Sequence, residues 1–125
     1  MPAPPIEIEL DKLAHNATKL TALYGSKGIC VTAVTKGVCG SPRIASALPN
    51  SGTRSFGDSR MANIQKKQEA GLDSQFILIR SPIPSEVERV VEFAHMSLNT
   101  EISARWCSLL GSKQPGKARP AYSGP

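Results

Sequence analysis

The sequence predicts an α/β fold in which short strands alternate with helices and pair in parallel. Two observations support this class: strand-like apolar runs recur along residues 6–101, and helical-period segments lie between them. A third observation is a nearly regular spacing: the polar residues that end successive strands are 22, 22 and 19 residues apart. These residues are Lys36, Asp58, Arg80 and Asn99. Consecutive right-handed βα units in a parallel sheet explain such a period.

The amino-terminal elements follow from local patterns. Residues 6–10 alternate between apolar and polar side chains, which predicts a strand. Asp11 is a suitable N-cap for the next segment, whose apolar residues fall at helical spacing, and Gly25 is a suitable stop. Residues 29–35 are β-branched and apolar and predict the second strand.

The alternation continues to the end of this region. Ser41 followed by Pro42 is typical of a helix start, and the sequence from Ser85 to Glu88 has the pattern of a capping box. The remaining expected elements are a helix to residue 48, a strand at 53–57, a helix at 59–70, a strand at 76–79, a helix from 85 and a short strand at 96–99.

Composition excludes several classes of protein. The chain has 125 residues, enough for one domain, and has no apolar stretch of membrane-spanning length. Its three cysteines, Cys30, Cys39 and Cys107, show no CxxC spacing, and its two histidines stand apart. A disulfide framework and a metal site are therefore not expected. With no signal-like amino terminus either, the sequence predicts a cytoplasmic protein without a membrane anchor.

The charge is unevenly distributed. The net charge is +5, but all ten acidic residues lie at or before Glu101. Residues 103–125 are basic, rich in Pro, Gly and Ser, and without periodicity. We therefore expect a domain over residues 1–102 and a disordered tail over 103–125. The domain itself is nearly neutral, so nucleic acid is not an expected partner.

Lys36 is the candidate reactive residue. It ends an apolar strand and is followed by Gly37, and lysine is unusual at such a place. Burial at a strand end would lower the pKa of the amine and make it a nucleophile able to form a Schiff base with an aldehyde cofactor. The alternative is a lysine that points into water. The other strand-ending residues would share its rim, since the carboxyl ends of parallel strands lie at one edge of the sheet.

Several motifs together resemble one family. They are residues 8–16, 34–37, 56–60 with Asn63 and Ile64, 79–82, and 97–101, in the family's order and spacing. The chain resembles the amino-terminal part of the alanine racemase-like, fold-type III enzymes that use pyridoxal 5'-phosphate, and within them the ornithine racemase type. The resemblance covers about four-fifths of the chain but about a third of a complete family member.

This resemblance implies a partial (β/α)8 TIM barrel, about the first four βα units, with parallel strands. It implies that Lys36 holds pyridoxal phosphate as an internal aldimine and acts as an acid/base group at the α-carbon of an amino acid. Arg80 would lie near the cofactor ring or a substrate carboxylate, or else form a salt bridge at the barrel rim. Asp58 and Asn99 would shape the pocket, although Asp58 equally suits the capping of the next helix. Cys39 fits loop packing better than catalysis. Full-length relatives are expected to be homodimers.

The resemblance ends near Ile102, before the later strands, the phosphate-binding loops and the second catalytic group of the family. We expect a disrupted reading frame or an incorrect gene model there, with a natural short form as the alternative. The function expected is the amino-terminal fragment of a pyridoxal-phosphate-dependent amino-acid racemase, inactive as the isolated chain. Two alternatives remain: a non-catalytic pyridoxal-phosphate-binding protein of the homeostasis type, and a small α/β binding module with a basic tail.

Overall fold

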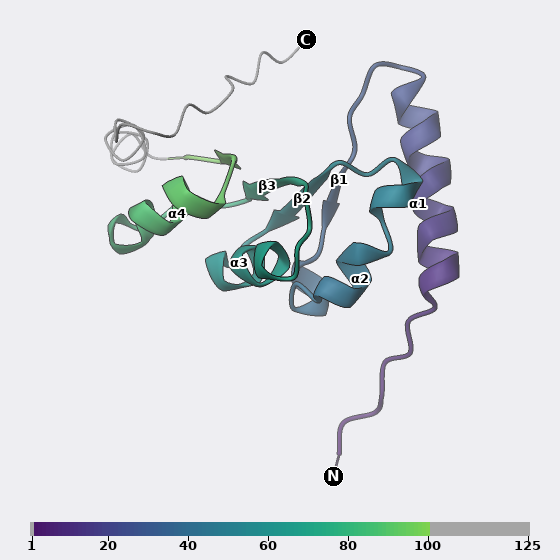
Figure 1. Cartoon of the computed structure of the whole chain (residues 1–125), viewed down its shortest axis with the longest axis horizontal. Coiled ribbons are helices and arrows are strands. Elements are labelled where there is room, and N and C mark those ends of the chain that lie inside the picture. The colour runs from purple at the N-terminus through teal and green to yellow at the C-terminus, as the bar shows by residue number, and fades with distance from the viewer. Residues whose placement is uncertain (1, 101–125) are drawn as a thin grey trace.

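The computed structural model describes residues 2–100, which form a four-stranded parallel sheet in the order β1-β2-β3-β4 (Figure 1). The strands are β1 (Thr32–Val34), β2 (Ser55–Asp58), β3 (Gln75–Leu78) and β4 (Met96–Ser97). Each pairs in parallel with the strand before it in the sequence. The α/β class and the parallel strands predicted from the sequence are confirmed, and the arrangement is consistent with a partial (β/α)8 barrel.

The helices alternate with these strands. They are α1 (Leu10–Gly25), α2 (Pro42–Ser46), α3 (Met61–Glu69) and α4 (Val87–Phe93), with the short 3₁₀ turns η1 (Lys36–Val38), η2 (Pro49–Ser51) and η3 (Pro84–Glu86). Figure 1 shows α2, α3 and α4 along one side of the sheet and α1 beyond the β1 edge. Pro42 occupies the first position of α2 after Ser41, as the sequence predicted.

The hydrophobic core fills the layer between the sheet and the helices. Phe56 and Phe76 stack with ring centroids 6.3 Å apart, and both are buried. The other buried members of the core are Ala45, Leu48, Met61, Ile64, Leu78, Val90 and Ala94. The opposite face of the sheet is less covered, since Val34 of β1 is 53% exposed. This is the face that points inward in a closed barrel.

Three expectations about the local structure were wrong. Residues 6–9 form no strand, and Ile6 is 88% exposed, because the described part of the chain offers them no partner for a ladder of hydrogen bonds. Helix α1 begins at Leu10, so its N-cap is Glu9 rather than Asp11. The capping box expected at Ser85 to Glu88 lies two residues earlier, because the carboxylate of Glu86 accepts the backbone N–H of Ile83 at 3.2 Å.

Among residues 2–100, no helix has both the length and the apolar character needed to cross a membrane. The predicted tail over 103–125, and with it the domain boundary at residue 102, lies outside the described residues and stays a prediction.

Candidate functional site

Lys36 lies two residues beyond the end of β1, where the strand turns into η1. The preceding residue anchors this turn: the backbone N–H of Thr35 donates to Gly57 O at 3.1 Å, and Thr35 O accepts the N–H of Gly40 at 2.9 Å. The Lys36 side chain is exposed, so the burial expected for it is absent in the described part of the chain. The strand end therefore has a fixed backbone and an accessible amine.

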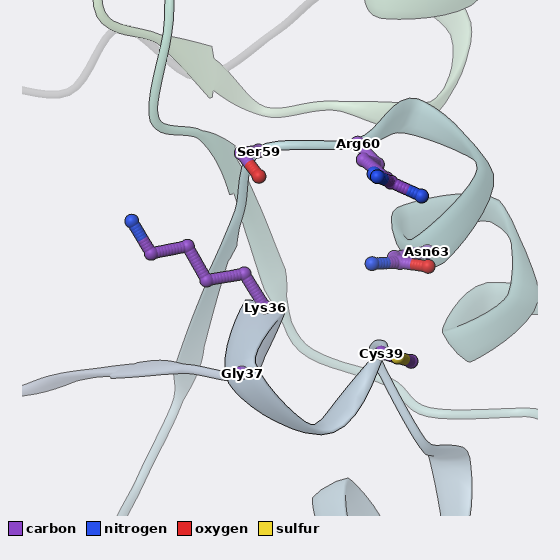
Figure 2. A pocket seen from close by; sticks show the side chains of 6 residues that line it. All are labelled: Lys36, Gly37, Cys39, Ser59, Arg60 and Asn63. Atoms are coloured by element: carbon purple, nitrogen blue, oxygen red, sulfur yellow. The ribbon is translucent and has the colours of Figure 1, made fainter.

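A cavity of about 270 Å³ lies beside this turn (Figure 2). Its lining residues are Lys36, Gly37, Cys39, Ser59, Arg60 and Asn63. In Figure 2 the Lys36 side chain leads away from Arg60 and Asn63, so the base of the side chain forms one wall and its amine reaches outward. The lining includes two cationic residues and no carboxylate.

Gly40 brings η1 against helix α3. It has φ +62°, and a Cβ atom built on it would lie 2.5 Å from Cβ of Asn63. A side chain at this position would combine a disfavoured left-handed backbone with a steric clash. A glycine is therefore needed to close the turn onto Asn63, the residue that forms the far wall of the cavity.

Asp58 ends β2 and points into the layer between the sheet and α3, where it is fully buried. Its Oδ1 accepts hydrogen bonds from Asn63 Nδ2 at 3.0 Å and from the backbone N–H of Arg60 at 3.1 Å. Helix α3 has Arg60 as its N-cap residue and no side-chain cap hydrogen bond, so Asp58 does not cap this helix and instead holds the backbone N–H of the residue before its first turn. Its Oδ2 accepts from Thr35 Oγ1 and from Lys67 Nζ, each at 3.2 Å. Asp58 lies behind the cavity and is absent from its lining.

Lys67 is the buried lysine of this site. Its side chain has no exposure, and Nζ donates to Asp58 and to Thr35 Oγ1. Burial lowers the pKa of Lys67, an effect that the neighbouring Asp58 charge only partly offsets. Burial alone would raise the pKa of Asp58, but the hydrogen bonds from Asn63 and Arg60 and the charge of Lys67 hold it below its usual value.

Lys67 was not predicted as a site residue from the sequence, although a signal was available. Met61, Ile64 and Lys67 follow one another at intervals of three residues in α3, and all three are buried. A lysine that continues the apolar stripe of a helix is a candidate for a buried, paired charge.

Arg80 lies two residues beyond β3 and links neighbouring loops. Its Nε donates to Ser59 O at 2.6 Å, and its guanidinium forms a two-point ion pair with Glu86. The hydrogen bond from Arg80 holds the pKa of Glu86 below its usual value, and the same bond raises the pKa of Arg80. The salt bridge considered for Arg80 from the sequence is present.

The four strand-ending residues thus have different surroundings. Lys36 and Asp58 are connected through Thr35, and Arg80 reaches the same loop through Ser59. Asn99 is not brought to this group, because its exposed side chain donates to Ser97 Oγ at 3.1 Å in its own segment.

Comparison with known proteins identifies the family. The family model described as "Alanine racemase, N-terminal domain" matches residues 8–120. The chain belongs to this family. The alanine racemase N-terminal domain accounts for the parallel βα units, and the resemblance seen in the sequence motifs is confirmed.

Two curated relatives are similar to this alanine racemase N-terminal domain. The lysine racemase of Thermotoga maritima is 34% identical over 97 residues, which are 77% of this chain and 27% of the relative. The ornithine racemase of Acetoanaerobium sticklandii is 38% identical over 100 residues, 79% of this chain and 28% of the relative. The chain thus spans little more than a quarter of the length of these relatives. No solved structure matches the chain.

Proposed function

We propose that this chain is the cofactor-lysine part of a pyridoxal-phosphate-dependent amino-acid racemase, with Lys36 as the residue that attaches the cofactor. The observation that carries the proposal is an exposed lysine amine directly after a parallel strand, in a chain of the alanine racemase N-terminal domain family. Parallel α/β folds place their sites at this end of the strands.

The residues around Lys36 fit covalent attachment of an aldehyde. The amine is accessible, and the lining of the adjoining cavity offers the hydroxyl of Ser59, the amide of Asn63 and the cation of Arg60. At about 270 Å³ the cavity lies near the lower end of the sizes usual for ligand pockets, which suits one side of a larger site. The lack of a carboxylate in the lining favours an anionic ligand at this wall.

When bound, pyridoxal phosphate supplies an electron sink for the charge that develops at the α-carbon of an amino acid. The role proposed for Lys36 is to hold the aldehyde carbon and to move a proton at one face of the α-carbon. We propose Arg80 as a rim residue that orients cofactor or substrate through its one remaining Nη2 hydrogen, because Ser59, Ser81 and Glu86 accept the other four. Asp58 is proposed to support the pocket from behind, whereas Asn99 is given no role in it, because its exposed side chain bonds to Ser97.

Racemisation requires acid/base groups on both faces of the α-carbon. Of the described residues that line the cavity, Lys36 is the one whose role we propose to be proton transfer. We therefore propose that the second group lies in the portion of the relatives that this chain does not match, and that the isolated chain does not turn over substrate. The homodimer expected for full-length relatives and the cytoplasmic location stay predictions.

The named relatives suggest a substrate class. Both are racemases of amino acids whose side chains end in an amine, and we propose such an amino acid here. No carboxylate among the cavity-lining residues is available to pair with a side-chain ammonium. Recognition of that ammonium is therefore proposed to come from outside this cavity.

The test is covalent attachment of the cofactor. The purified chain is mixed with pyridoxal phosphate, reduced with borohydride and digested, and the modified lysines are identified by mass spectrometry. We expect preferential modification at Lys36 and a new absorption band that Lys36→Ala abolishes. Lys19→Ala, which alters an exposed lysine of α1, is the matched control and should change neither. Modification spread equally over the exposed lysines contradicts the proposal.

A non-catalytic pyridoxal-phosphate-binding protein is the second candidate. It is favoured by the same observation, the accessible amine of Lys36 beside the cavity, since no second proton-transfer group is proposed there. The two differ in substrate handling: before reduction, a racemase fragment should release cofactor bound to Lys36 faster in the presence of lysine or ornithine, because substrate amines displace Lys36. A carrier should release cofactor equally with or without these amino acids.

A further inference from the structure

We propose that Lys67 is a positioning residue: through Thr35 and Asp58 it fixes the strand end from which Lys36 projects. This inference rests on the proposed function of Lys36 and adds the device that orients it. Lys67 itself is fully buried and cannot reach a ligand in the cavity, so its effect must pass through the residues it contacts.

Thr35 is the link to Lys36. Its backbone has φ −107° and ψ 8°, in the bridge region between strand and helix, where the chain leaves β1 and enters η1. Its side-chain hydroxyl accepts a hydrogen bond from Lys67 Nζ and donates one to Asp58 Oδ2 at 3.2 Å. A residue held at its backbone and its hydroxyl determines the direction in which the next residue leaves the sheet.

Asp58 extends the same network to the opposite wall of the cavity. Its Oδ1 holds the backbone N–H of Arg60 and the side chain of Asn63, and both of these residues line the cavity. One carboxylate therefore joins the turn that carries Lys36 to the start of α3. The geometry of the cavity depends on whether this carboxylate stays in place.

Lys67 is what keeps the carboxylate in place. A buried carboxylate without a counter-charge is strongly disfavoured and tends to take up a proton or to move toward water. The ammonium of Lys67 lies 3.2 Å from Oδ2 and supplies that charge from the helix that forms the far wall. A purely packing role would not need an amine at this position, because a methionine could fill the same space.

The experiment compares variants that keep the shape of the network but remove its hydrogen bonds. Thr35→Val is close in volume to threonine and lacks the hydroxyl, whereas Thr35→Ser keeps the hydroxyl. A double variant, Lys67→Met with Asp58→Asn, removes both buried charges together and avoids leaving either one unpaired. Lys19→Met on α1 serves as the control. Circular dichroism establishes that each variant is folded at the assay temperature.

The first readout is the rate at which pyridoxal phosphate is trapped on Lys36, divided by the rate on the exposed Lys27 of the same molecule. We expect this ratio to fall at least about tenfold in Thr35→Val and in the double variant, since displacement of a reacting group by about 1 Å can cost up to about a hundredfold in rate. Thr35→Ser should restore the ratio to within about twofold of the starting chain. An unchanged ratio in folded Thr35→Val overturns the inference.

The second readout needs no cofactor and separates this inference from the proposed function. Hydrogen exchange followed by mass spectrometry reports on the amides of residues 36–40. We expect faster exchange there in Thr35→Val and in the double variant, with α1 unaffected. If the starting chain shows no preference for Lys36 in trapping, the proposed function fails, and exchange decides the positioning role alone. Equal protection of residues 36–40 in all variants then overturns it.

Discussion

The Nζ atom of Lys67 lies 3.2 Å from Oδ2 of Asp58, and neither side chain has any exposed surface. The pair joins the end of β2 to α3, directly behind the turn that carries Lys36. Every polar atom of the pair that is buried has a hydrogen-bond partner in the described structure. A buried pair is costly to break by removing one partner, because the remaining charge loses its compensation.

Substituting Lys67 alone should therefore destabilise the domain. For Lys67→Met we expect a loss of about 3–5 kcal/mol in the free energy of unfolding, measured by urea denaturation. The matched control is Lys66→Met, which alters the exposed neighbour on the same helix and should cost less than about 1 kcal/mol. Equal effects of the two substitutions would show that burial of Lys67 carries no special energetic weight.

Stability should also fall in acid for a definable reason. The folded-state pKa of Asp58 is lowered, so its contribution is present above the unfolded pKa of about 4 and is lost as the pH falls through the folded value. Glu86 acts in the same direction in the same range, because its hydrogen bond from Arg80 lowers its pKa.

Unfolding midpoints measured between pH 7 and pH 2 should separate the two carboxylates. Asp58→Asn and Glu86→Gln should each reduce the fall of the unfolding midpoint in acid. The two substitutions together should reduce this fall more than either one alone. Asp58→Asn is expected to be the less stable variant at pH 7, because it leaves Lys67 without its counter-charge. If the unfolding midpoints of both variants fall in acid as they do in the starting chain, Asp58 and Glu86 are not the source of the acid dependence.

Glycine at position 40 is a further requirement of the site. We expect Gly40→Ala to lower stability by about 2 kcal/mol or more, because its φ of +62° and its contact with Asn63 both disfavour a Cβ atom. The control is Gly25→Ala, at the end of α1, where a Cβ would meet nothing within 4 Å. Thermal unfolding compares the two. A neutral Gly40→Ala would mean that η1 can move away from α3 without cost.

The sequence was sufficient to predict the order of strands and helices, because it depends on local periodicity and on glycine and proline signals. Phe76–Ile79 and Ser41-Pro42 were found for this reason. The strand predicted at 6–10 failed because a strand needs a partner, and pairing is not visible in a local pattern. The spacing of Met61, Ile64 and Lys67 was a signal that Lys67 is buried, but its partner Asp58 is a tertiary contact that no local pattern shows.

The site was predictable in part for the same reason. The position of Lys36 at a strand end followed from the apolar run before it, and the structure has it there. Its exposure did not follow, because exposure depends on what covers the end of the sheet. The ion pair between Arg80 and Glu86 could not be predicted from the sequence, because it forms only when η3 folds back toward β3, which is a tertiary contact.

The stabilisation by the ion pair of Arg80 with Glu86 should depend on the shape of the guanidinium group and not only on its charge. Arg80→Lys keeps the charge but cannot reproduce two parallel hydrogen bonds to one carboxylate while also donating to Ser59 O. We expect Arg80→Lys to lose most of the effect of the pair, about 1 kcal/mol in urea unfolding, and Glu86→Gln to lose a similar amount. A double variant should cost little more than either single one, since both remove the same interaction. Additive losses would show that Arg80 and Glu86 contribute independently.

The last prediction concerns catalysis by the 125-residue chain. We expect interconversion of the enantiomers of lysine or ornithine no faster than with pyridoxal phosphate alone, because one lysine can serve only one face of the α-carbon. Chiral chromatography after prolonged incubation measures this, with the ornithine racemase of Acetoanaerobium sticklandii as the positive control. Exchange of the α-hydrogen with deuterated water, without inversion, is the expected partial reaction if Lys36 holds the cofactor, and Lys36→Ala should abolish it. Racemisation above the protein-free rate that survives in Lys36→Ala would point to a contaminating enzyme, whereas racemisation that depends on Lys36 would contradict the proposal that the second group lies outside this chain.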